Sequence, residues 1–321
     1  MANKRKFGLI VLVLVLLASI FLFAACHRPK LVEKSSRDFE HMGEKPADST
    51  LINIDSLGAT DDEKVFALYS IALDNLRDTP YCAAYNEGWF ECYMLGQNNI
   101  LYDDYIIMKT PNKYFFCNYR AIKECPIAEN ALFGDIFRNM GSILSERRYY
   151  EKGKEYALQQ SVGNNYMDEN GLPTTNWNEA EITHIDPIVF NADDNPNLFV
   201  INEHDVFYEN RMQGTASYEY NETDGYYTIK FELDPDKATT KSRIKIKDSI
   251  GDKNAYYTYL SYEITIWDNG YFRTYNNDSY FAGKVVIGLD FKDIYRWSFS
   301  YNEEDCGISI YADAAGIRDK Y

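Results

Sequence analysis

The sequence predicts an α+β fold, in which a strongly curved antiparallel β-sheet, an incomplete barrel, packs on one or two amphipathic helices. Tyrosine is unusually frequent, with 28 Tyr in 321 residues, and Tyr suits half-buried sheet faces because its ring packs inward while its hydroxyl stays hydrated. Several segments alternate apolar and polar residues between turn sequences. An early segment has helical periodicity, and such a helix can bury its apolar side only against one sheet face.

The first helix is predicted over residues 60–79. Thr60 and Glu63 have the spacing of a capping box. Apolar residues then recur every three or four positions until the Thr-Pro pair at 79–80, and they are Val65, Leu68, Ala72 and Leu76. One side of this helix is therefore expected to be buried.

A second amphipathic helix is predicted over residues 127–147, where apolar residues also recur at helical spacing. Arg147 and Arg148 at its end would suit the negative end of the helix dipole. This segment would supply the second helix of the predicted fold.

Strands are expected over most of the remaining chain. Asn269-Gly270 separates two alternating segments, 264–267 and 271–275, and predicts a hairpin. Further strands are expected at 81–95, 105–118, 226–233, 297–301 and 308–311. Residues 163–225 are rich in Gly, Asn and Asp and have poor periodicity, so they predict long loops or an insertion.

The N-terminus has the pattern of a bacterial export signal. Lys4, Arg5 and Lys6 precede an uncharged, apolar stretch that ends in two small residues before Cys26. Residues 23–26, Phe-Ala-Ala-Cys, resemble the lipobox of bacterial lipoproteins, although Phe stands where that family prefers Leu.

The lipobox resemblance implies that a lipoprotein signal peptide, residues 1–25, is removed and that Cys26 becomes a diacylglycerol- and palmitate-bearing first residue. The chain would then be lipid-anchored to the bacterial cell membrane and extracytoplasmic. An uncleaved transmembrane anchor is the alternative, because the apolar stretch can just span a hydrocarbon core of ~30 Å. Both alternatives leave the bulk of the chain outside the cytoplasm, since the basic end stays inside.

Residues 26–59 predict a flexible tether that leads to a single β-rich extracytoplasmic domain, residues 60–321. The segment is rich in charge and shows no sustained apolar period, so it buries too little surface to fold alone. The whole chain carries a net charge of −16, which repels phosphate backbones and anionic headgroups. No nucleic-acid partner is expected, and the membrane is expected to be contacted through the N-terminal lipid.

Five cysteines lie beyond the lipobox. Cys82 and Cys92 would face each other if residues 86–88 formed a three-residue hairpin loop, and a disulfide would then need a non-hydrogen-bonded pair of positions. Two free, half-buried thiols are the alternative. Cys117 and Cys125 present the same choice.

No cofactor and no metal site are predicted. His184 and His204 each have an aspartate close by, but neither pair has further ligands at metal-site spacing, so solvated loop residues are the simpler interpretation. Acid clusters at 193–195 and 221–224 raise calcium as a hypothesis, yet turn chemistry accounts for both. No motif of a nucleophile, P-loop or dinucleotide site occurs, so no catalytic residue is assigned and enzymatic activity stays undecided.

Two binding functions follow as predictions. The order of elements, with segments 226–234 and 264–280, resembles the LolA/LppX group of periplasmic and lipid-anchored proteins, whose incomplete barrels hold lipids or lipoproteins. This resemblance implies a binding protein with an amphiphilic or apolar small molecule, or an envelope partner, in its half-barrel. The alternative is a surface interaction module that binds glycan or protein through an aromatic patch of Trp267, Tyr271 and Tyr275. Cross-strand packing is the competing explanation for these aromatic residues.

Overall fold

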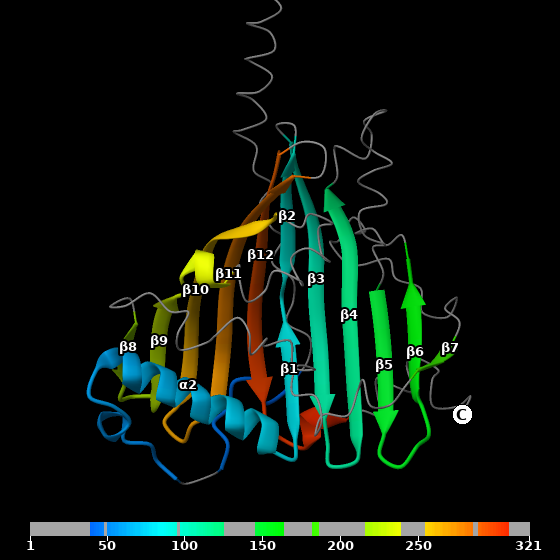
Figure 1. Ribbon diagram of the computed structural model, residues 1–321. Helices are drawn as coiled ribbons and strands as arrows, with labels where there is room; N and C mark the ends of the chain where they lie inside the picture. The colour runs from blue at the N-terminus through cyan, green and yellow to red at the C-terminus, as the bar shows by residue number, and fades with distance from the viewer. Residues whose placement is uncertain are drawn as a thin grey trace, which may run out of the picture.

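The computed structural model describes residues 39–47, 50–94, 97–124, 145–163, 182–185, 216–238, 254–284 and 288–307. In this part of the chain, twelve strands form one strongly curved antiparallel sheet, and a long helix, α2 (Asp61–Asp78), packs on it (Figure 1). The predicted α+β fold class is confirmed. The strands are β1 (Cys82–Asn86), β2 (Trp89–Met94), β3 (Gln97–Lys109), β4 (Lys113–Glu124), β5 (Ser145–Glu151), β6 (Ala157–Val162), β7 (Ile182–Ile185), β8 (Ser217–Asn221), β9 (Tyr226–Glu232), β10 (Tyr256–Trp267), β11 (Phe272–Lys284) and β12 (Gly288–Ser300). Two short 3₁₀ helices accompany them, η1 (Ile54–Ser56) and η8 (Glu304–Cys306).

The strand order is β7-β6-β5-β4-β3-β1-β12-β11-β10-β9-β8, with β2 also paired to both β3 and β12. Strands β1 and β2 follow each other along one line between the same two neighbours. Asn86 lies opposite Tyr105, and Trp89 lies opposite Tyr102, so the register on β3 continues unchanged across the break. The predicted strand at 81–95 is therefore a pair of collinear segments, and the hairpin loop at 86–88 that a Cys82–Cys92 disulfide would require does not form.

Helix α2 begins and ends as the sequence predicts. Thr60 Oγ1 accepts the Glu63 N–H at 3.3 Å, and the Glu63 carboxylate accepts the Thr60 N–H at 3.2 Å. All four apolar residues of the predicted stripe are buried. The helix crosses the lower ends of β8 to β12 (Figure 1), and we call the face that it covers the helix-side face.

Both faces of the sheet carry buried side chains, and they alternate along each strand with a period of two. Ala84 and Ile107 belong to the cluster on the helix-side face. Their neighbours Ala83 and Ile106 belong to a smaller cluster on the opposite face. Phe39, Met42 and residues of η8 pack against that second cluster, which means that the chain's two described ends cover it.

The predicted second helix is wrong at its C-terminal end. Residues 145–151 form strand β5, in which Arg147 pairs with Cys117 of β4. Burial alternates along this strand, with Ser145, Arg147 and Tyr149 on one face, so sheet pairing overrides the helical pattern that was extended into it. The rest of the predicted helix lies outside the described residues.

Part of the predicted tether belongs to the folded domain. Residues 39–47 and 50–59 lie against the sheet, where the Ile52 N–H donates to the carbonyl of Asp268 at 2.7 Å and the Tyr227 hydroxyl donates to the carbonyl of Ile52. Ile54 is buried. Both partners are far from Ile52 in the sequence, and composition alone does not reveal such contacts. Residues 26–38 lie outside the described part.

The predicted hairpin around Asn269-Gly270 is confirmed. Gly270 has a φ of 85° in the turn between β10 and β11, and Gly225 has a φ of 73° in the turn before β9. The expected strand at 105–118 is a second hairpin, because Thr110 to Asn112 turn the chain between β3 and β4. Most of 163–225 and the strand expected at 308–311 fall outside the described residues, although β7 and β8 lie within the predicted loop region.

Candidate functional site

The candidate site is a pocket on the helix-side face, at the point where α2 leaves the sheet. Its volume is about 420 Å³, within the range of ~300–1,000 Å³ that small-molecule sites occupy. It is lined by Arg77, Asp78, Thr79, Pro80, Lys109, Thr110, Pro111, Asn112, Lys113, Tyr114, Tyr150 and Lys152. We call it the basic pocket, because four of these residues are basic and one is acidic.

Three chain reversals build the rim of the basic pocket. The first is the end of α2, where the Thr79 N–H donates to the carbonyl of Asn75 and Pro80 prevents further helix. The second is the β3–β4 turn, which the Lys113 N–H closes by donating to Thr110 Oγ1 at 3.0 Å. The third follows β5, and the Lys152 N–H donates to the carbonyl of Asn112 at 2.7 Å. The two turns are thus fastened to each other.

Two of the four cations already have partners. Arg77 forms ion pairs with Asp74 at 2.8 Å and with Asp78 at 2.9 Å. The hydrogen bond to Asp78, together with both aspartates' charges, raises the pKa of Arg77. The Lys109 ammonium donates to the carbonyl of Arg77 in the last turn of α2, where a cation suits the helix dipole.

Lys113 and Lys152 are different, because neither has an acidic partner within the described part of the chain. A surplus of positive charge therefore remains at the pocket of a chain whose net charge is −16. Such a local reversal of sign attracts anions.

The aromatic wall of the pocket is a cross-strand pair, Tyr114 of β4 and Tyr150 of β5. Tyr114 is fully buried, and burial raises the pKa of its hydroxyl well above the usual value. The ring therefore stays neutral at physiological pH. Tyr150 is only partly buried, so its ring can pack against the apolar part of a ligand whose charged group meets the cations.

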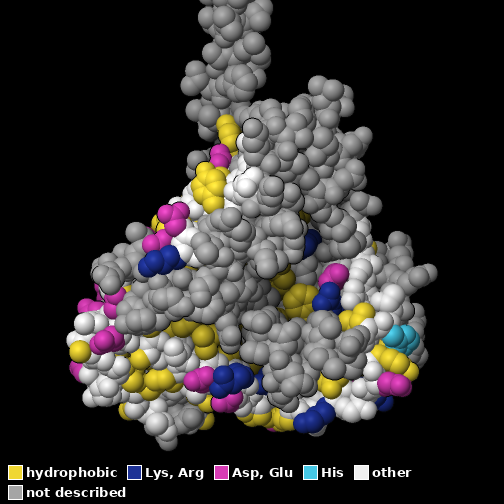
Figure 2. Space-filling model, viewed as in Figure 1, with side chains coloured by type: hydrophobic (Ala, Val, Ile, Leu, Met, Phe, Trp, Pro, Cys, Tyr) yellow, Lys and Arg dark blue, Asp and Glu magenta, His cyan; other side chains and the backbone are white. Residues whose placement is uncertain are grey.

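A charged network lies on the same face, further along β3 and β4. The Asp103 carboxylate accepts hydrogen bonds from Tyr105 Oη, Asn118 Nδ2 and Arg120 Nε, each at 2.7 Å. The charge of Asp103 holds the pKa of Arg120 well above its usual value, and burial raises the pKa of Tyr105. Figure 2 shows acidic, basic and hydrophobic side chains close together on this face, to the right of α2. The face beyond the helix is therefore polar as well as aromatic.

The possible disulfide between Cys82 and Cys92 does not form. Cys82 lies opposite Lys109 and Cys92 lies opposite Asn99 on strand β3. Ten strand residues at ~3.3 Å each separate these positions, whereas a disulfide needs Cα atoms within ~7 Å. Cys82 and Cys92 are therefore not joined to each other; both side chains are fully buried, and so is Cys117. Cys26 and Cys125 lie outside the described residues.

The predicted aromatic patch does not form an exposed surface. Trp267 and Tyr275 are buried, and Tyr275 contacts Tyr69 of α2 and Tyr262 of β10. Tyr271 packs edge-on against Tyr301 with ring centroids 4.8 Å apart. The competing explanation, packing between elements, accounts for all three aromatic residues.

The histidine and acid clusters weighed as metal sites lie partly within the described residues, and there they are turn and surface residues. Asn221 Oδ1 accepts the backbone N–H groups of Thr223 and Asp224 at 3.0 Å, so this cluster serves its turn. His184 is exposed on β7, and its ring meets the ring of Tyr156. Asp186, the 193–195 cluster and His204 lie outside the described residues.

The sequence analysis missed the basic pocket. Its cations come from three separate reversals, so no spacing along the chain connects them. The one available signal is the Thr-Pro stop at the end of α2, which marks the rim but not its charge.

No known protein-family model matches the chain, and no curated protein shows significant sequence similarity to it. Among the described residues, no helix has both the length and the apolar character needed to cross a membrane.

Proposed function

We propose that the chain is a lipid-anchored, extracytoplasmic binding protein that takes an amphiphile with an anionic head in the basic pocket. The observation that carries this proposal is the meeting of Lys113 and Lys152 with Arg77 and Lys109 in a chain that is otherwise strongly acidic. Surface charge of one sign is ordinary, but a local reversal inside a concave site points to a ligand of opposite charge.

The residues that line the pocket also indicate that the ligand has an apolar portion beside its charged group. Tyr150 and two prolines offer apolar surface beside the cations, so a carboxylate, phosphate or sulfate with an apolar portion suits the pocket better than a bare ion. The space under α2 is filled instead, since Tyr69 contacts both Phe231 and Phe272 there. The proposed ligand therefore lies beside the helix end and not beneath the helix.

The anchor is the second half of the proposal and depends on Cys26. Replacing Cys26 with Ser should move the protein from the detergent-rich to the aqueous phase in a detergent phase-separation assay, because the acyl chains would be missing. Retention of the variant in the detergent phase would contradict lipidation at this residue.

The pocket is tested with dansyl-undecanoate and its methyl ester, which has nearly the same size but no charge. We expect saturable binding of the acid and at least tenfold weaker binding of the ester. The Lys113→Gln/Lys152→Gln double variant should bind the acid at least tenfold more weakly, since even one hydrogen bond to a charged group contributes ~1.5–3 kcal/mol and ~1.4 kcal/mol is tenfold in affinity.

Lys154→Gln is the matched control. Lys154 is exposed in the same turn as Lys152 but does not line the pocket. The Lys154→Gln variant should therefore bind the acid with the affinity of the parent protein. Equal binding of acid and ester, or unchanged affinity in the double variant, would contradict the proposal.

A further inference from the structure

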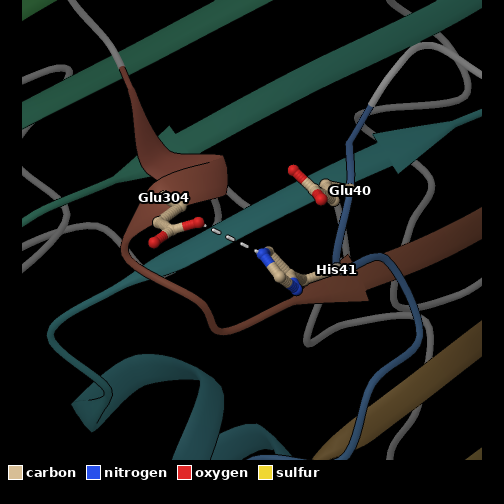
Figure 3. Close-up of side chains that lie close together, drawn as sticks. All are labelled: Glu40, His41 and Glu304. Atoms are coloured by element: carbon tan, nitrogen blue, oxygen red, sulfur yellow. Dashed lines mark hydrogen bonds and ion pairs between the residues drawn. The ribbon is translucent and has the colours of Figure 1, made fainter.

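A second cluster of charged side chains lies on the opposite face of the sheet, where the segment 39–44 runs beside η8 (Figure 3). The Asp305 carboxylate accepts the backbone N–H groups of Glu40 and His41, both at 3.0 Å. The Gly43 N–H donates to the carbonyl of Phe299 at 2.8 Å. These bonds fix the backbone and bring the His41 side chain next to Glu304.

Both nitrogens of His41 face carboxylates. Nδ1 lies 3.0 Å from Glu44 Oε2, and Nε2 lies 3.4 Å from Glu304 Oε2. The Glu40 carboxylate is close as well, and one ligand atom from each of Glu40, His41 and Glu304 lies within 4.8 Å of the others. Figure 3 shows the three side chains converging from two separate segments.

The carboxylates of Glu40, Glu44 and Glu304 around a neutral His41 ring leave an excess of negative charge at this position. A neutral imidazole has one N–H donor and one acceptor nitrogen. If Nδ1–H donates to Glu44, the lone pair of Nε2 faces the Glu304 oxygen, and two acceptors oppose each other. Among the described residues, neither Glu40 nor Glu304 has a Lys or Arg partner.

We propose that His41 Nε2, Glu40 and Glu304 bind a divalent transition-metal ion of the Zn²⁺ type, with water completing the coordination. One imidazole and two carboxylates suit Zn²⁺, whereas Ca²⁺ and Mg²⁺ prefer oxygen ligands alone. Zinc ligands at ~2.0–2.2 Å lie ~3.4 Å apart in a tetrahedron. Glu40 and Glu304 are exposed, so their side chains can rotate to close that gap.

Glu44 is the positioning residue of this site. Its carboxylate holds the proton on Nδ1 and so directs the lone pair of Nε2 towards the two glutamates, as carboxylate–histidine pairs do beside protein-bound zinc. A bound ion would fasten segment 39–44 to the end of β12, which gives the site a stabilising effect independent of the basic pocket.

The test is a titration of chelator-treated protein with ZnCl₂ at pH 7.5 in competition with a chromophoric chelator. We expect one ion per chain, at least tenfold weaker binding in His41→Gln and in Glu304→Gln, and visible absorption bands of a four-coordinate ion when Co²⁺ replaces Zn²⁺. Saturating Zn²⁺ should also raise the thermal midpoint, since an ion bound only to the folded state stabilises it.

His184→Gln is the matched control, because it removes an exposed histidine from β7 and should leave zinc affinity unchanged. Glu304→Gln changes an exposed side chain, so it tests the site without threatening the fold. Parent-like zinc affinity in both the His41 and the Glu304 variants would overturn the proposal, as would the absence of binding at 100-fold excess of metal.

Discussion

The helix-side face has two halves of different chemistry. Over the lower ends of β8 to β12 it is covered by α2 and consists of packed aromatic rings, such as Phe231 stacked on Tyr262 with centroids 4.9 Å apart. Over β3 to β5 the helix has ended, and the same face carries Asp103 with Arg120 and Glu146 with Arg148. We call these the covered half and the charged half.

The difference follows from where α2 stops. A side chain under the helix is sealed from water, so apolar area contributes ~25 cal/mol per Å² there and an unpaired charge would be costly. Over β3 to β5 no described helix covers this face. Charged groups and hydroxyls stay closer to water there, so their desolvation costs less free energy. The covered half therefore holds the fold together, and the charged half, which contains the basic pocket, is where binding is proposed.

The largest expected effect is in the covered half. Phe231→Ala should lower the free energy of unfolding by about 3–5 kcal/mol, because it removes a ring packed against Phe66, Tyr69 and Tyr262 and leaves a cavity. Urea denaturation measures the change. Tyr256→Ala, at an exposed position of β10, should cost no more than about 0.5 kcal/mol, and equal losses in both variants would refute the assignment of the core to this half.

The charged half should respond more weakly and in a different way. Asp103→Leu and Arg120→Met, made singly, should each lower the free energy of unfolding by about 2–3 kcal/mol, less than the ~3–5 of a fully buried pair, since Arg120 is 39% exposed. The double variant Asp103→Leu/Arg120→Met should recover part of this loss, because it leaves no uncompensated charge.

A double-mutant cycle in urea measures that recovery. A double variant at least as unstable as the sum of its single variants would show that the pair is not coupled. The contrast between the two halves would then disappear.

The covered half could be predicted because its signals are local. The capping box at Thr60, the stripe through Leu76 and the Asn-Gly turn at 269–270 each depend on residues within one turn or hairpin. Strand alternation then assigns each side chain to a face, and a helix of this kind has only one way to bury its stripe.

The charged half and the pocket could not be predicted, because their signals are non-local. Lys109 ends strand β3 and Lys152 follows strand β5, and nothing in the sequence places them together. The same limit applies at 86–88, where a turn-like sequence only interrupts a strand held in register by β3 and β12. It also explains β5, whose pairing with β4 overrides a local helical pattern.

The smallest expected effect tests whether the two ends of α2 are independent. Thr60→Ala should lower the free energy of unfolding by about 1 kcal/mol, because the Glu63 N–H loses its cap. Ser70→Ala is the control, since its hydroxyl only bonds back to the carbonyl of Phe66 within the helix, and Ala has the higher helix propensity. Urea denaturation gives the stabilities, and dansyl-undecanoate titration gives the affinities. If the pocket depends on the C-terminal end of α2 alone, the Thr60→Ala variant should bind the probe with the affinity of the parent protein. A loss of affinity would instead mean that the whole length of the helix positions the pocket.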